Sequence, residues 1–272
     1  FSLKNMIDSL KHWMTDYHIN GFRFDLMGVH DQETMKEIYK ELVKIDPDVM
    51  VYGEPWVGGD KNASIATEGA ISVGNTNGVA AFDDDFRDAI KGAEYGGFHK
   101  GQVQGTYNDS GIIKGLSGAS GKNKRNTTGR PALSLHYVEC HDNYTLYDKL
   151  NISLSASAVG SDECVKYWIL DTKLTDTYKK LIADQNKLSA AYVFLAQGTP
   201  FINGGQEFMR TKKGNPDSYA ADTKGGHKWS EKEILNCNAI DLNFKDTYSD
   251  VKCNEIFFLI FSIFQKVLKT QN

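Results

Sequence analysis

The first 54 residues of the chain alternate between two hydrophobic patterns. Apolar residues repeat at helical spacing over 3–17 and again over 35–45, and this spacing predicts two amphipathic helices. A short apolar segment follows each helix, at 21–27 and at 49–52. The run at 49–52 is continuously apolar, which is typical of a strand that is buried on both faces of a parallel sheet, and 21–27 is also predicted to be a short strand. The order helix, strand, helix, strand therefore predicts an α/β fold.

The rest of the chain carries three further strand patterns and three further helix patterns, separated by polar or glycine-rich segments. The expected strands are 79–82, 133–140 and 199–203, and the expected helices are 84–91, 178–197 and 254–270. The segments 92–133, 144–176 and 210–250 are predicted to be irregular, with short helices within 144–176. Because neither repeats nor low-complexity linkers interrupt this order, we expect one domain with insertions.

Composition narrows the class of protein. The chain has 272 residues, of which 40% are hydrophobic, so it can bury a large core without disulfides. Its net charge of −4 disfavours a strongly cationic nucleic-acid binder, and its four cysteines form no CxxC pair. The most apolar run, 256–264, is far shorter than the ~20 residues that cross a membrane. We therefore expect neither nucleic acid nor membrane as a partner.

Acidic residues stand at the C-terminal ends of three expected strands. They are Asp25, Glu54 and Asp142. In a parallel α/β sheet or barrel the strand C-termini converge on one face, and that face holds the active site. Carboxylates that share a cleft are the groups that hydrolyse glycosides, one as nucleophile and another as acid and then base.

The neighbours of these acids support the same chemistry. Arg23 lies two residues before Asp25, so both side chains are expected on the same face of the strand, where the arginine would keep the carboxylate ionised. His141 and Asn143 flank Asp142 and could donate hydrogen bonds to sugar hydroxyls. Trp56, close after Glu54 in the sequence, offers a flat apolar surface for a sugar ring.

Several segments resemble the conserved regions of the α-amylase superfamily, in the form that type I pullulanases carry. The similar segments are GFRFDLMG at 21–28, YGEPW at 52–56, YVECHDN at 137–143, YTLYDKL at 144–150, GTPFINGGQEF at 198–208 and RTKKG at 210–214. Their order and spacing fit the family.

The resemblance implies a fold, an activity and roles for individual residues. It implies a (β/α)8 TIM barrel that cleaves α-1,6 linkages in pullulan, amylopectin or glycogen fragments with retention of configuration. Asp25 would be the nucleophile, Glu54 the general acid/base, and Asp142 the residue that stabilises the transition state. Arg23 and His141 would support them.

The sequence also departs from the family pattern. The first conserved region, an Asp…Asn-His motif, is absent, and five barrel strands are expected where the family has eight. We therefore expect residues 1–272 to be an incomplete barrel, about strands 4 to 8, without strands 1 to 3 or accessory domains. In the loop after the last strand, Arg210 and Tyr219 are the expected substrate contacts, although the residues after Tyr219 differ from the family. Cys140 stands where serine is usual.

The expected activity needs no cofactor. The histidines lack ligand spacing and HExxH is absent, so no catalytic metal is predicted. The family resemblance would allow a structural calcium, but no DxDxDG loop supports one. The basic side chains of Lys212 and Lys213 are expected on a solvated loop.

Two other functions remain open at this point. One is an isoamylase-like, glycogen-debranching or α-1,4-acting enzyme of the same superfamily. The other is a non-catalytic glucan-binding fragment. The sequence context of residues 26–28 and 55–56 favours a pullulanase-type enzyme.

Overall fold

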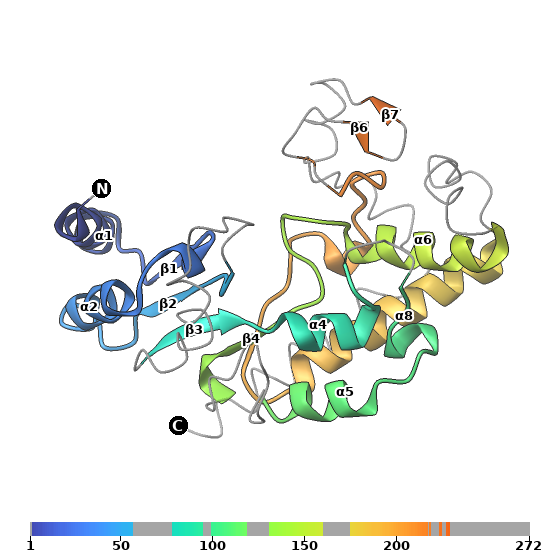
Figure 1. Cartoon of the computed structure of the whole chain (residues 1–272), viewed down its shortest axis with the longest axis horizontal. Helices are drawn as coiled ribbons and strands as arrows, with labels where there is room; N and C mark the ends of the chain where they lie inside the picture. The colour runs from blue at the N-terminus through green and yellow to red at the C-terminus, as the bar shows by residue number, and fades with distance from the viewer. Residues whose placement is uncertain are drawn as a thin grey trace. The chain divides into compact units, whose positions relative to one another are not determined.

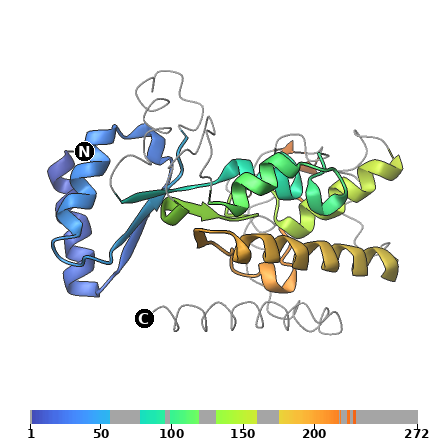
Figure 2. The same ribbon diagram turned by 90° about the horizontal axis from the view of Figure 1, so that it is seen from below.

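The computed structural model describes residues 2–56, 78–94, 99–118, 131–159, 175–216, 218, 223–224 and 227–228. Its ribbon is shown in two views (Figures 1 and 2). The chain divides into two compact units. Unit 1 comprises Phe1–Asp85, Ile113–His136 and Ala196–Thr199, and unit 2 comprises Phe86–Ile112, Tyr137–Leu195 and Pro200–Asn272.

Unit 1 is built on a sheet whose first four strands are parallel. The strands are β1 (Gly21–Phe24), β2 (Met50–Gly53), β3 (Val79–Phe82), β4 (Ser134–His136) and β5 (Thr199–Pro200), in the spatial order β1-β2-β3-β4-β5. Consecutive strands along the chain are therefore neighbours in the sheet. The α/β class and the five strand positions predicted from the hydrophobic pattern are confirmed.

Two helices cover the β1 end of this sheet, α1 (Leu3–Tyr17) and α2 (Gln32–Leu42), and they lie side by side in both views (Figures 1 and 2). Ser2 and Asp31 cap their N-termini with side-chain oxygens. Ile7 on α1 and Ile38 on α2 join a core that also includes Val51 of β2. The amphipathic spacing thus buries one stripe of each helix against the sheet.

Unit 2 is mainly helical. Most of α4 (Asp84–Lys91) belongs to it, together with the first residues of α5 (Asp109–Leu116), and α6 (Leu146–Val159) packs against α8 (Asp176–Leu195).

Short 3-10 turns occur in both units: η1 (Met27–Val29), η3 (Gln102–Gln104), η4 (Pro131–Leu133) and η6 (Gln206–Phe208). A two-stranded antiparallel pair joins β6 (Thr223–Lys224) to β7 (His227–Lys228).

Several expected boundaries were wrong. The strand expected over 21–27 ends at Phe24, because Leu26 adopts a left-handed backbone with a φ of 45°. The strands expected over 133–140 and 199–203 shorten to β4 and β5. One helix stands where irregular chain was expected, α5 within 92–133. Within 144–176, where loops with short helices were expected, α6 extends over 14 residues.

Other expected elements keep their places. The helix expected over 178–197 is confirmed as α8, and that over 84–91 as α4. The expected helix 254–270 lies outside the described residues. Within the described part of the chain, no helix has both the length and the apolar character to cross a membrane.

Candidate active site

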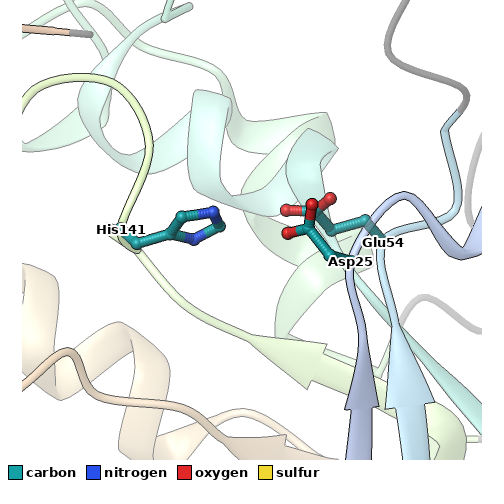
Figure 3. A group of neighbouring side chains, drawn as sticks. All are labelled: Asp25, Glu54 and His141. Carbon is teal, nitrogen blue, oxygen red and sulfur yellow. The ribbon is translucent and has the colours of Figure 1, made fainter. Parts of the chain in front are cut away.

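Adjacent parallel strands place Asp25 and Glu54 next to each other in unit 1. Phe24 of β1 is paired with Gly53 of β2, so the residue after each strand emerges at the same edge of the sheet. A carboxylate oxygen of Asp25 lies within 4.8 Å of one of Glu54. Figure 3 shows both carboxylates beyond the tips of their strands and on the same side. The predicted meeting of these two acids at the strand C-termini is therefore observed.

The Arg23 side chain bridges the two acids. Its Nη1 donates to Oδ1 of Asp25 and its Nη2 donates to Oε1 of Glu54, each at 2.5 Å. The guanidinium also lies over the ring of Phe82, 5.9 Å from its centroid. One planar cation thus forms an ion pair with each of two carboxylates, a geometry that suits the forked donors of arginine better than a lysine ammonium.

Asp25 and Glu54 differ sharply in exposure. The Asp25 side chain is 61% exposed, whereas that of Glu54 is 5% exposed. Glu54 compensates with a second donor, because the backbone N–H of Leu26 donates to its Oε2 at 2.8 Å. The exposed carboxylate is open to a reactant, and the buried one is held in a fixed orientation.

The turn after Asp25 fits closely against the segment after Glu54. The backbone N–H of Gly28 donates to the carbonyl of Glu54 at 3.0 Å. A Cβ at position 28 would lie 2.6 Å from the carbonyl oxygen of Trp56, a distance that real Cβ atoms do not tolerate. Glycine at this position therefore allows the two loops to meet. Trp56 itself is half-buried.

Arg23 also bears on metal binding at this edge. Carboxylates such as Asp25 and Glu54 are suitable ligands for a hard cation. The Arg23 guanidinium already binds one oxygen of each, however, and Leu26 binds the other oxygen of Glu54. In this arrangement the two carboxylates are ligands of the Arg23 guanidinium, as in an ion pair, and not arranged around a cation site.

In unit 2 the loop between β4 and α6 carries His141, Asp142 and Asn143. Nε2 of His141 lies 3.4 Å from Oδ1 of Asp142, and both side chains are about half exposed (51% and 48%). Nδ1 of His141, which Figure 3 also shows, lies 3.3 Å from Sγ of Cys140. Asn143 has a left-handed backbone with a φ of 60°. The loop is thus open to solvent and has a specific bent conformation.

Unit 2 also contains buried charged residues, whose burial was not predicted from the sequence. They include Lys91, Glu139, Asp148, Lys149 and Lys212. Burial raises the pKa of Glu139 to about 7 and that of Asp148 to about 6. Burial lowers the pKa of Lys149 to about 8. Burying a charge without partners is costly, so these groups indicate a polar interior in this part of unit 2.

The expectation of a solvated 212–213 loop was wrong for Lys212. Its side chain is buried, with 1% of the residue exposed, whereas Lys213 is exposed. Arg210 is half-buried, and its backbone N–H donates to Gly205 at 2.9 Å. Tyr219 lies outside the described residues.

A further acid follows a strand in unit 1. Asp83 stands directly after β3, and its Oδ2 lies 3.5 Å from Nδ1 of His136, with both residues buried. The other ring nitrogen of His136 contacts the carbonyl oxygen of Gln197 at 2.9 Å. The signal that selected Asp25 and Glu54, an acid after an apolar strand, would also have found Asp83.

Each unit therefore holds one group of the expected site residues. Arg23, Asp25 and Glu54 form a connected set in unit 1. His141, Asp142 and Asn143 share one loop in unit 2.

Comparison with known proteins finds pullulanases and glycogen operon proteins. No family model matches the chain. It is 31% identical over 241 residues to a pullulanase of Bacillus subtilis, a match that covers 85% of this chain and 30% of the relative. It is 27% identical to the glycogen operon protein GlgX homolog of Mycobacterium tuberculosis, over 94% of this chain and 35% of the relative.

Solved structures agree. The chain superimposes on the pullulanase of Paenibacillus barengoltzii, solved with maltohexaose and alpha-cyclodextrin, with a TM-score of 0.74 and 31% identity over 97% of this chain and 36% of that one. These similarities are consistent with a pullulanase-like domain of the α-amylase superfamily. The chain spans about a third of the length of these three proteins.

Proposed function

We propose that this chain carries the catalytic residues of a debranching glycosidase that cleaves α-1,6-glucosidic linkages in pullulan, amylopectin or glycogen-derived dextrins. The observation that carries the proposal is the pair Asp25 and Glu54, bridged by Arg23 at adjacent strand ends. Their oxygens approach within 4.8 Å, which is close to the ~5–5.5 Å between the carboxyl groups of retaining glycosidases and short of the ~6.5–9.5 Å of inverting ones.

Asp25 is assigned as the nucleophile. Its carboxylate is the exposed member of the pair and is held ion-paired by Arg23. It attacks the anomeric carbon, a glycosyl ester with Asp25 forms, and the bond to the O6 leaving oxygen breaks.

Glu54 is assigned as the acid and then the base. It gives a proton to the leaving oxygen, and in the second half of the reaction it takes a proton from the water that hydrolyses the ester. Both of its oxygens accept hydrogen bonds in this structure. The acid step therefore requires the Arg23–Glu54 hydrogen bond to open as the substrate oxygen arrives.

Asp142 is assigned to the sugar hydroxyls, with His141 and Asn143 beside it. Hydrogen bonds from hydroxyls to a carboxylate strengthen as positive charge develops on the ring. Trp56, Arg210 and Tyr219 are assigned as further substrate contacts, because an aromatic face and a cation suit a sugar ring and its hydroxyls.

The fold that accompanies this function is a (β/α)8 barrel, of which residues 1–272 would supply about strands 4 to 8. The parallel sheet with consecutive strands side by side, and an acid after each of β1, β2 and β3, supports this assignment. In such barrels the catalytic side chains project from the C-terminal ends of the strands.

The test is the product formed from pullulan. Cleavage at α-1,6 linkages releases maltotriose, whereas an α-1,4-acting enzyme releases panose. We expect maltotriose from the natural protein and almost no product from the Asp25→Asn variant. Asp16→Asn, at an exposed acid on α1, is the matched control and should leave the rate unchanged.

A second candidate function is debranching of glycogen rather than pullulan. The similarity to a glycogen operon protein favours it. Rates on glycogen phosphorylase limit dextrin and on pullulan, compared for the same preparation, separate the two. Binding of maltotetraose without hydrolysis of any of these glucans would instead indicate a non-catalytic glucan-binding chain.

A further inference from the structure

Lys212 binds the backbone on both sides of Asp142. Its Nζ donates to the carbonyl oxygen of His141 at 2.9 Å and to that of Asn143 at 2.7 Å. These carbonyls belong to the residues immediately before and after Asp142. Lys212 is 1% exposed, so water does not replace either carbonyl as the partner of its ammonium group. The ammonium thus holds the backbone on both sides of one carboxylate.

Asp148 on α6 holds Lys212 in turn. Its Oδ2 accepts from the backbone N–H of Lys212 at 2.8 Å and from that of Gly214 at 3.3 Å, and its Oδ1 accepts from Oγ1 of Thr211 at 2.5 Å. Burial raises the pKa of Asp148 to about 6, and the hydrogen bonds from Thr211, Lys212 and Gly214 oppose that increase. Burial lowers the pKa of Lys212, and the charge of Asp148 opposes that decrease. Two buried charges of opposite sign therefore compensate each other.

Lys212 also binds the residue at which the loop bends. Asn143 has a φ of 60°, a left-handed conformation that asparagine adopts more readily than most residues other than glycine. Its carbonyl receives the shorter of the two Lys212 hydrogen bonds. Without a donor there, the Asn143 carbonyl would lose this hydrogen bond, and the loop would gain by turning that carbonyl toward solvent.

We propose that Lys212 is a positioning residue for the reaction: its bonds to His141 and Asn143 fix the direction in which Asp142 presents its carboxylate. This inference rests on the proposed function of Asp142 in gripping the sugar. A misplacement of ~1 Å in a catalytic group can lower a rate by ~10²-fold. Lys212 therefore acts on turnover through Asp142 without touching the substrate.

The test compares Lys212→Met with Lys213→Met in the natural protein. Methionine keeps the unbranched length of lysine but donates no hydrogen bond. Lys213 is the matched control, because it is adjacent and exposed, and its bond to Thr211 uses only the backbone N–H. Lys212→Gln is the second variant, since an amide can still donate to one carbonyl if Lys212→Met fails to fold.

The first readout needs no catalysis. Backbone amide hydrogen exchange over residues 140–146 reports how tightly the loop is held. We expect exchange there to accelerate about tenfold or more in Lys212→Met, less in Lys212→Gln, and not at all in Lys213→Met. Unchanged exchange in both Lys212 variants would overturn the inference, whatever the protein hydrolyses.

The second readout separates positioning from general stability. We expect Lys212→Met to lower kcat on pullulan about 10²-fold with KM within about threefold, and Lys213→Met to leave both unchanged. In an Asp142→Asn background the further loss from Lys212→Met should be less than about threefold, because the two residues act as a unit. An undiminished loss in that background would show that Lys212 does not act through Asp142.

Failure of the proposed function would look different. If the unaltered protein releases no maltotriose from pullulan, the debranching assignment fails, and hydrogen exchange alone then decides whether Lys212 holds the loop.

Discussion

The backbone N–H of Leu26 donates to Oε2 of Glu54 at 2.8 Å while Leu26 itself occupies the left-handed region, with φ and ψ both 45°. The residue that follows one candidate catalytic acid is therefore bonded to the other. A left-handed backbone is uncommon outside glycine and asparagine, and here the hydrogen bond to a buried carboxylate helps to hold it. The same hydrogen bond therefore stabilises the turn at Leu26 and fixes the orientation of the Glu54 carboxylate.

This relationship predicts a difference between two variants of Leu26. Both Leu26→Ala and Leu26→Gly remove the side chain beyond Cβ, but only glycine adopts the left-handed region without strain. We expect the glycine variant to have the larger free energy of unfolding, by about 1 kcal/mol. Urea unfolding of the pair measures it. Equal stabilities would mean that the turn relaxes to another conformation when the side chain is lost.

Glu54→Gln tests the acid role through the leaving group. Glutamine cannot supply the proton that a poor leaving group needs, so hydrolysis of pullulan should slow by about 10²–10⁴-fold. An aryl glycoside with an activated leaving group needs no such proton, and its glycosylation step should slow much less. If both substrates were slowed equally, the acid would have to be another residue. Glu139 is the next carboxylate to test, although it is buried and binds Leu146 and Asn203.

Arg23 is expected to matter for both stability and turnover. Arg23→Met leaves two carboxylates within 4.8 Å of each other without a shared cation. We expect the free energy of unfolding to fall by about 2 kcal/mol and kcat on pullulan to fall about 10²-fold. Lys36→Met removes an exposed surface ion pair and should change neither quantity appreciably. A variant of Arg23 with normal kinetics would remove the guanidinium from the proposed mechanism.

Burial of Glu139 predicts how stability depends on pH. The pKa of Glu139 is raised by burial to about 7 in the folded protein, against an ordinary value of 4.5. Between those two values the folded state keeps a proton that the unfolded state releases, so stability falls as pH rises from about 4.5 to about 7. The contribution is on the order of 3 kcal/mol.

The variant Glu139→Gln should remove that slope. Its amide oxygen can still accept from Leu146, and it does not ionise. Free energies of unfolding at pH 5, 6, 7 and 8 should therefore fall less steeply for this variant than for the unaltered protein. Glu33→Gln, at a side chain that is 82% exposed, is the control and should follow the unaltered curve. Parallel curves for Glu139→Gln would contradict the prediction.

Much of unit 1 follows from local pattern alone. The apolar stripes on α1 and α2 and the short strand patterns of β1 and β2 can each be recognised locally. The parallel pairing of β1 with β2 then brings Asp25 beside Glu54. The left-handed turn at Leu26 could not be predicted, because leucine normally avoids that region. Its hydrogen bond to Glu54 depends on a residue 28 positions away.

Unit 2 was predicted less well, and the reason is its buried polar groups. Helix α6 buries Asp148, Lys149 and Ser153, so its sequence lacks the apolar stripe that identifies a helix. Helix α5 contains Gly111 within a glycine-rich stretch, which indicated irregular chain. Lys212 was expected in solvent because charged residues are rarely buried unless they are paired, and its partners lie about 70 positions away along the chain.

The Arg23 bridge has a consequence for how the protein folds. Arg23, Asp25 and Glu54 all belong to one strand–helix–strand segment, β1-α2-β2, and the bridge joins residues only 31 positions apart. Closing a loop of this length costs little entropy compared with pairing distant parts of a chain. The geometry between the two acids is thus encoded in a contiguous stretch of about 30 residues. The Arg23 bridge therefore closes without bringing together residues that lie far apart along the chain.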